Sequence, residues 1–250
     1  MKNLIQAELL KLRTTRTFFW SAVAALVLVP ISVATAIQTA GNEGAGPSLA
    51  TTEGIRNVFA AASSATTVIL IIGILMMAGE FRHNTAAATF LVTPDRRRVV
   101  GAKLIAGTLV GAGLAAVASL LTLAIAVPWL AAKDIHVSIL SGDVGLVLLA
   151  AVVATALYAL VGVGIGSLIR NQTAAVVVAL LWVMVIESLL IVLLPSVGKW
   201  APGGAAAALT AVATKDGGLL SMWAGGLLFA AYGLGFAATG SRFVLRRDVA

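Results

Sequence analysis

Six long runs of apolar residues, separated by short polar segments, make up most of the chain. Each run is long enough to cross about 30 Å of hydrocarbon as an α-helix. None alternates polar and apolar residues over about ten positions, as the strands of a membrane β-barrel do. The pattern therefore predicts an all-α, polytopic membrane protein with one transmembrane domain over residues 1–250. The six expected spans are Phe18–Ala40, Val58–Ala78, Val100–Leu130, Val144–Ile169, Ala174–Leu194 and Leu219–Thr239.

Two shorter apolar patterns predict helices that do not cross the membrane. Near the N-terminus, Ile5, Leu9 and Leu12 recur at helical spacing among basic residues. This spacing favours an interfacial amphipathic helix over residues 2–16, and a charged lead-in to the first span is the alternative. Before the last span, Gly204–Ala213 is apolar but too short to cross, and prolines and glycines flank it. We expect a short external re-entrant helical segment there.

The composition excludes an ordinary soluble domain. Hydrophobic residues make up 60% of the chain and charged residues 11%, with a mean hydropathy of +1.04. Soluble domains are about 45–50% apolar and about 25% charged. The chain has no cysteine, which excludes disulfides and thiolate chemistry. Because no clear cleavage pattern follows the first apolar run, we expect a retained span there and not a cleaved signal peptide.

The net charge of +7 is distributed in a way that indicates membrane orientation. Six spans place both termini on one side of the membrane. If that side is the cytoplasm, all but four of the 17 Lys and Arg residues fall in cytoplasmic segments, the exceptions being Arg56, Lys133, Lys199 and Lys215. Short loops rich in Lys and Arg resist translocation. We therefore expect cytoplasmic N- and C-termini, contact with membrane lipid, and no nucleic-acid partner.

The sequence lacks the motifs of enzymes, nucleotide sites and metal sites. It contains no G-x-x-x-x-G-K-[ST] phosphate loop, no H-E-x-x-H zinc pattern and no G-x-S-x-G nucleophile. Its two histidines, His83 and His136, are expected on opposite sides of the membrane. The sequence therefore predicts no enzymatic activity, no catalytic residue, and no metal or cofactor bound by this chain.

Glu187 is the one acidic residue that lies clearly inside a predicted span. A carboxylate in lipid is unfavourable unless it is protonated, paired or facing water. Glu187 therefore either faces a substrate pathway or a partner subunit, or is a neutral carboxyl hydrogen-bonded to a neighbouring helix, through Ser188 or a backbone carbonyl. The first interpretation admits an alternative function, an ion-gradient-driven secondary transporter or channel that uses Glu187.

Glycines four residues apart occur in two of the spans. Gly107 and Gly111 lie in the third, and Gly162 and Gly166 in the fourth. Such pairs allow two helices to approach closely. We expect ordinary helix packing at both, within one chain or between two.

The segment EFRHNTAAATFLVTPDRRRVV, Glu80–Val100, is the most polar stretch of the chain. Asn84 is expected to cap a short helix over Thr85–Val92. Thr93 is then expected to cap the next helix, with Pro94 at its first position. The segment is thus predicted to form a short helix between two breaks, on the cytoplasmic side.

A compact helix in this loop favours a surface that docks another protein. A loop that only reversed direction would need few residues, and here Phe90 and Leu91 are available for an apolar contact. The alternative is a solvated loop whose arginines bind anionic lipids.

The order of these elements, and the polar segment itself, resemble the membrane-spanning permease subunit of ABC-2-type transporters. These permeases have an acidic residue after the second span, then a Thr-rich short helix, then Pro, Arg and Lys. The residues that match this order are Glu80, Thr85, Thr93, Pro94, Arg97 and Lys103. The segment KWAPGGAAAAL, Lys199–Leu209, is also similar to this family.

The resemblance implies a permease subunit of an ATP-driven exporter in a bacterial cell membrane. Two permease chains, identical or different, would form the substrate pathway, and each would dock a separate cytoplasmic ATPase through the short helix around Asn84–Val92. ATP and Mg would be bound by that ATPase. The expected docking residues are Glu80, Asn84, Thr85, Phe90, Leu91, Thr93, Pro94 and Arg97. The substrate is not evident from the sequence.

Overall fold

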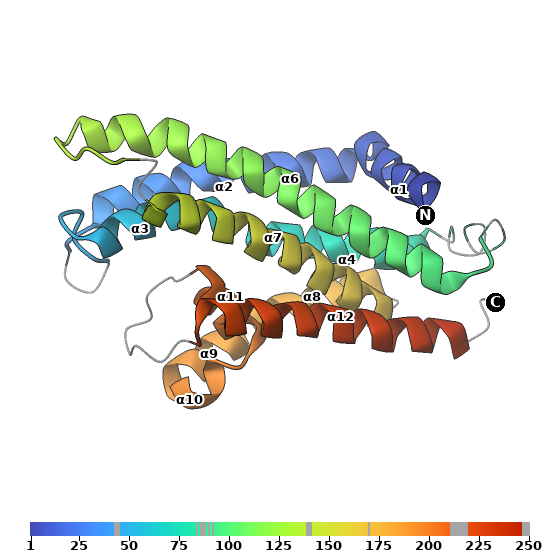
Figure 1. Cartoon of the computed structure of the whole chain (residues 1–250). Helices are drawn as coiled ribbons and strands as arrows, with labels where there is room; N and C mark the ends of the chain where they lie inside the picture. Colours follow the sequence, from blue (N-terminus) through green and yellow to red (C-terminus); the bar gives the residue numbers. More distant parts are fainter. Residues whose placement is uncertain are drawn as a thin grey trace.

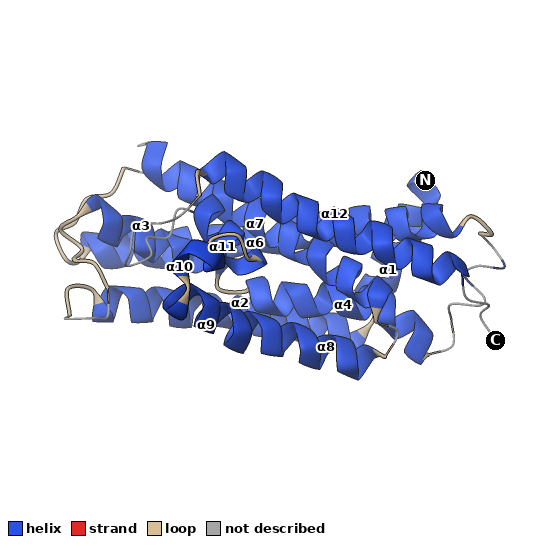
Figure 2. Ribbon diagram, turned by 90° about the horizontal axis from the view of Figure 1, so that it is seen from below, coloured by secondary structure: helices blue, strands red, loops and turns tan. Residues whose placement is uncertain are grey.

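Long helices running side by side form the protein in this computed structural model (Figure 1). The structure describes residues 1–42, 46–83, 85, 89, 91, 93–138, 142–169, 171–210 and 220–246. In this part of the chain, Figure 2 shows helices joined by loops and no strand. Six helical segments there are long and apolar enough to cross a membrane, by length and composition. The predicted all-α, six-span fold is confirmed.

The first half of the chain contains three of these spans, preceded by the N-terminal helix. Its helices are α1 (Lys2–Thr14), α2 (Arg16–Thr39), α3 (Thr52–Ala60), η1 (Ala61–Ser63), α4 (Thr66–Arg82) and α6 (Arg96–Ala131). The second span begins at Thr52, six residues before the predicted start, because the Thr51 side chain caps α3 by accepting from the Gly54 N–H. A short 3₁₀ turn, η1, joins α3 to α4.

The second half contains the other three spans and two short helices. Its helices are α7 (Gly142–Leu168), α8 (Gln172–Leu181), η2 (Trp182–Ile186), α9 (Glu187–Leu193), α10 (Pro195–Gly198), α11 (Pro202–Thr210) and α12 (Met222–Arg246). The fifth span is α8, η2 and α9 in succession, and η2 is a π-helical turn inside it. The last span continues to Arg246, beyond the predicted end at Thr239, since no proline or glycine after Gly240 interrupts the helix.

The predicted cap of the third span is wrong. The N-cap is Asp95 and not Thr93, and Pro94 precedes the helix. The Asp95 carboxylate accepts the backbone N–H groups of Arg97 at 3.1 Å and Arg98 at 3.3 Å. A carboxylate at this position also interacts favourably with the positive end of the helix dipole, which a threonine hydroxyl does far less.

The helix α7 lies at the centre of the bundle and packs against α4, α6 and α12. Its two spaced glycines lie against α4, where a Cβ on Gly166 would come within 2.7 Å of the Ile74 carbonyl oxygen. In α6, a Cβ on Gly111 would come within 2.9 Å of the Ala159 side chain of α7. The predicted close packing is therefore confirmed, and in this structure it lies within one chain.

The two non-spanning segments both form helices that pack on the bundle. The apolar stripe of α1, made of Ile5, Leu9 and Leu12, packs against the buried cluster that α4, α6 and α7 share. Its location in the headgroup layer stays a prediction. The second segment, α11, is buried against α12 and α7 and is too short to cross the membrane. Its predicted last residues, 211–213, lie outside the described part of the chain, and its re-entry from the external side stays a prediction.

The N-terminal helix and the end of α12 lie at the same end of the bundle (Figure 1). This end, called the terminal end below, also contains the C-terminal end of α4 and the start of α6. The segments α3, α10 and α11 lie toward the opposite end.

Candidate functional site

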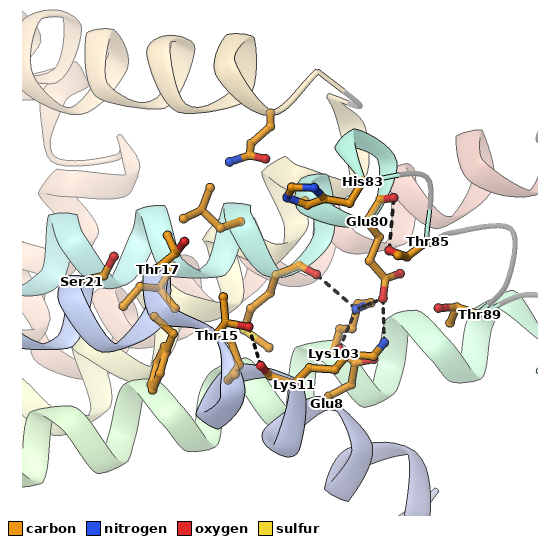
Figure 3. Close-up of a pocket in the computed structure, with 17 residues that line it drawn as sticks. Glu8, Lys11, Thr15, Thr17, Ser21, Glu80, His83, Thr85, Thr89 and Lys103 are labelled. Atoms are coloured by element: carbon orange, nitrogen blue, oxygen red, sulfur yellow. Dashed lines mark hydrogen bonds and ion pairs between the residues drawn. The ribbon is translucent and has the colours of Figure 1, made fainter.

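Four charged side chains from three helices meet at the terminal end (Figure 3). Glu8 and Lys11 come from α1, Glu80 from the last turn of α4, and Lys103 from the second turn of α6. The Lys103 ammonium donates to Glu8 Oε2 at 2.6 Å, to Glu80 Oε1 at 2.9 Å and to the Met76 carbonyl oxygen at 3.1 Å. An ammonium has three N–H donors, so this lysine is fully satisfied.

Lys11 joins the same two carboxylates from the outer side. Its ammonium lies 2.8 Å from Glu8 Oε1 and 2.8 Å from Glu80 Oε1. Each carboxylate therefore contacts both ammonium groups, and the two negative charges balance the two positive ones. These four residues, called the ion network below, tie α1 to α4 and α6.

The ion network is largely removed from solvent. Lys103 is 1% exposed, Glu8 6% and Glu80 9%, whereas Lys11 is exposed. Buried charges are stable only when each has an oppositely charged partner and its hydrogen bonds are made. Removing any one member therefore leaves another buried charge without its balance.

Helical geometry explains how α1 contributes a buried acid. Glu8 follows Ile5 by three residues and precedes Leu12 by four, so it lies on the same face as the apolar stripe. That face packs on the bundle, and the carboxylate is carried inward with it. On α6, Lys103 lies on the face that packs toward α4, where its ammonium reaches Glu80 and the Met76 carbonyl oxygen.

The Lys11 side chain has a raised pKa. Partial burial lowers this pKa, but the hydrogen bonds and charges of Glu8 and Glu80 outweigh that effect and move it above the ordinary value of 10.5. The folded state then holds this proton more tightly than the unfolded chain does. The stability contributed by the Lys11 charge is complete below pH 10.5 and is lost as the pH rises through the folded-state pKa.

We therefore expect the free energy of unfolding to fall as the pH rises above 10.5, in part through Lys11. The Lys11→Arg variant should show a smaller fall, because arginine stays charged to about pH 12 and beyond. Unfolding midpoints of the purified protein between about pH 9 and about pH 12 measure the difference. An unchanged pH profile in the variant would show that Lys11 is not stabilised by its two carboxylates.

The structure places part of the predicted docking helix. The Thr85 N–H donates to the Glu80 carbonyl at 3.0 Å, Thr89 N–H to the Thr85 carbonyl at 3.0 Å and Thr93 N–H to the Thr89 carbonyl at 2.9 Å. The last two bonds join residues four apart, as in an α-helix. Leu91 lies in this helical turn and is 82% exposed. The predicted site residues Asn84 and Phe90 lie outside the described part of the chain.

The remaining predicted site residues lie apart from the ion network. Thr93 is partly buried, and Pro94 and Arg97 are exposed. Among the docking residues that the structure describes, only Glu80 belongs to the network, and it is buried there instead of being presented on the surface. Lys103, which matched the family pattern, is its direct partner.

A cavity of about 490 Å³ adjoins the ion network between α1, α2 and α4. Polar side chains, among them Thr15, Ser21 and His83, line it together with the network (Figure 3). Gln172 also lines this cavity, and its Oε1 atom is buried without a hydrogen-bond partner among the described residues. Among the residues that the structure describes, no three His, Cys, Asp or Glu side chains are grouped as a metal site would require.

Glu187 is buried in the fifth span, far along the chain from the network. Its Oε1 atom accepts the Trp182 indole N–H at 2.7 Å and the Gly203 backbone N–H at 2.9 Å. The Ser188 hydroxyl, a partner considered from the sequence, donates instead to the Met184 carbonyl. The backbone partner is the Gly203 N–H of α11, which donates to Glu187, and not the expected backbone carbonyl. Glu187 also lines a second cavity, described below.

Sequence reasoning missed Glu8, Lys11 and the π turn. The signal for Glu8 was an acid inside an apolar helical stripe, and Lys11 follows it at a spacing that permits an ion pair. The contact between Trp182 and Glu187 was not predictable from their spacing, because residues five apart lie roughly 140° apart around an α-helix. Only the π turn brings them together.

The chain is similar to a known protein family. Residues 4–197 match the model of a family described as "ABC-2 family transporter protein". The matched region includes the whole ion network, the helical turn at Thr85–Thr93 and Glu187. No curated protein matches the chain. Since the family match extends over most of the chain and the fold has six candidate spans, the chain is a multi-pass membrane protein that belongs to the ABC-2 transporter family.

Proposed function

We propose that this chain is the permease subunit of an ATP-driven exporter and that its terminal end docks a separate ATPase. The observation that carries the proposal is the link between an exposed helical turn and the ion network. Thr85, at the start of the turn, donates its N–H to the carbonyl of Glu80, whose side chain holds Lys11 and Lys103. A displacement of the turn therefore acts directly on α4, and through Glu80 on α1 and α6.

The distribution of basic residues supports the proposed orientation. Arg82, Arg97 and Arg98 are exposed close to the turn. Basic residues flanking spans favour the cytoplasmic side. We propose that the terminal end faces the cytoplasm of a bacterial cell, where an ATPase and its ATP and Mg are available. The chain has no phosphate loop, so nucleotide binding is assigned to the partner.

The export pathway is proposed to form between two permease chains. The fifth span carries many exposed apolar side chains, including Val177, Leu181, Val185 and Leu189. In a membrane, these face either lipid or another helix. A second permease chain, identical or different, packed along this span would place two bundles side by side with a path between them.

Replacing Leu91 with Asp tests the docking surface. We expect at least about tenfold weaker association with the ATPase subunit, because a leucine that becomes buried in an interface contributes about 1.5–3 kcal/mol. Co-purification of the tagged permease with its ATP-binding-cassette subunit, followed by titration of the purified partners, measures this. ATP-dependent export should fall in parallel.

The matched control is Leu10→Asp, at a leucine of α1 that is 61% exposed at the same end of the bundle. It makes the same chemical change away from the helical turn, and we expect it to leave the association unchanged. Both variants should unfold at the wild-type temperature. If Leu91→Asp kept wild-type association and export, the ATPase would have to dock elsewhere.

A further inference from the structure

A second cavity, of about 590 Å³, lies between α7, the fifth span and α12. Its walls are almost entirely apolar, and aromatic rings contribute much of them. The aromatic lining residues are Tyr158, Trp182, Trp200, Phe229, Tyr232 and Phe236. Trp182 and Trp200 are exposed, so the cavity reaches the surface of the bundle at their rings. Its size and lining are those of a site for a small organic molecule.

Glu187 is the one acidic or basic side chain among the described residues that line this cavity. It is only 3% exposed. Both of its hydrogen bonds are made by Oε1, and Oε2 accepts none from the described residues. Oε2 therefore remains available to a ligand that brings a positive charge or an N–H group, and such a ligand would stabilise a carboxylate in these apolar surroundings.

The position of this carboxylate is fixed by two local features. The π turn η2 brings Trp182 onto the same side of the span as Glu187, which an α-helix would not do. The absence of a side chain at Gly203 lets the carboxylate lie against the backbone of α11, since a Cβ there would collide with Glu187 Oε2. A π turn interrupts regular helix geometry, and such turns occur often at functional sites.

Three kinds of small molecule can be weighed against this lining. An anion would be repelled by the carboxylate at close range in a medium of low dielectric constant. A neutral hydrocarbon would fill the volume but leave Oε2 without a partner. A cation on an apolar body would pair with the carboxylate, contact the aromatic faces and fill the remaining volume.

We propose that this cavity binds a lipophilic organic cation, with Glu187 as its counter-ion. The proposal goes beyond the assignment of ATPase docking and does not depend on it, because no residue of the ion network lines this cavity. Binding is therefore measured in the permease without ATPase or ATP.

Two ions of the same shape and opposite charge, tetraphenylphosphonium and tetraphenylborate, provide the test. The purified permease in lipid nanodiscs is equilibrated with each ion, and binding to empty nanodiscs is subtracted. In a variant with Trp20, Trp129 and Trp223 replaced by Phe, the fluorescence of Trp182 and Trp200 gives a second readout from the cavity wall. We expect saturable binding of the phosphonium ion, at least tenfold tighter than that of the borate.

The Glu187→Gln variant keeps the shape of the side chain and removes its charge. We expect it to weaken phosphonium binding at least tenfold and to reduce the difference between the two ions. The matched control, Glu53→Gln, makes the same change at an exposed position of α3 and should bind as the wild type does. Val183→Trp keeps Glu187 and fills the cavity, so it should abolish binding of the phosphonium ion.

Several results would overturn the proposal. Equal binding of the two ions, or wild-type binding by Glu187→Gln, would remove the counter-ion role. If Glu187→Gln did not fold, unchanged phosphonium binding by the folded Val183→Trp variant would show that the cavity is not the site. Absence of saturable binding in a permease dimer, with Trp182 shielded from a soluble quencher, would show that a second copy of the chain occupies the cavity.

Discussion

Replacing Lys103 with Met is expected to destabilise the membrane domain by about 3–5 kcal/mol. The variant leaves Glu8 and Glu80 buried with only one positive charge, that of Lys11, between them. Methionine fills much of the space of the lysine stem but donates no hydrogen bond, so the Met76 carbonyl also loses a contact. Unfolding of the purified protein in a mild detergent, followed by temperature or denaturant, measures the loss.

A double variant separates lost charge balance from lost packing. In Glu80→Gln/Lys103→Met, Glu8 and Lys11 remain as a balanced pair 2.8 Å apart. We expect the double variant to be more stable than Lys103→Met alone, because no buried carboxylate is left in excess. Lys133→Met, at an exposed lysine outside the network, is the matched control and should unfold as the wild type does. A Lys103→Met variant as stable as this control would mean that the network contributes no net stability.

The membrane fold was predictable from the sequence because each span depends on local composition. A run of about 20 apolar residues must be helical in lipid, whatever its neighbours are. Span limits were less predictable, since they depend on which polar atom caps the helix. At α6 the sequence predicted the hydroxyl of Thr93 as the cap, whereas the carboxylate of Asp95, two residues later, caps the helix.

The candidate site was predictable only in part, because its partners are distant in sequence. The polar segment after the second span indicated Glu80 as a site residue, and the resemblance to the permease family pointed to Lys103 as well. That the two form an ion pair, and that Glu8 reaches Lys103 from a position 95 residues away, depends on how α1, α4 and α6 pack. The Trp182–Glu187 pair depends on a π turn. The fifth span is apolar on all sides, so the spacing of its apolar residues does not reveal where such a turn occurs.

Two features of the bundle hold α4 in place, the ion network and a close crossing with α7. At the terminal end, the ion network joins α4 to α1 and α6 through Glu80. Farther along, Gly73 of α4 lies against α7, where a Cβ would collide with the Ala159 carbonyl oxygen. A charge network responds to a displaced partner by exchanging contacts, whereas a close-packed backbone crossing does not yield. The crossing with α7 therefore leaves α4 less room to shift there than at its terminal end.

Substituting alanine for Gly162 tests this crossing with the smallest possible change. A Cβ at Gly162 would collide with the Leu70 carbonyl oxygen and come within 3.0 Å of the Gly73 Cα atom. Both are backbone atoms of α4, so the two helices must move apart to admit it. We expect a loss of about 1–3 kcal/mol in the free energy of unfolding, as for other overpacked interiors. The loss appears even though alanine is the better helix former by about 1 kcal/mol.

Gly113→Ala in α6 is the matched control, because a Cβ there meets nothing within 4 Å. It makes the same chemical change in a neighbouring span, and only the gain in helix propensity applies. We expect its unfolding midpoint to equal or slightly exceed that of the wild type, while Gly162→Ala unfolds earlier. If both variants shifted alike, the α4–α7 crossing would have room for a side chain, and the close approach of the two backbones would not limit the packing.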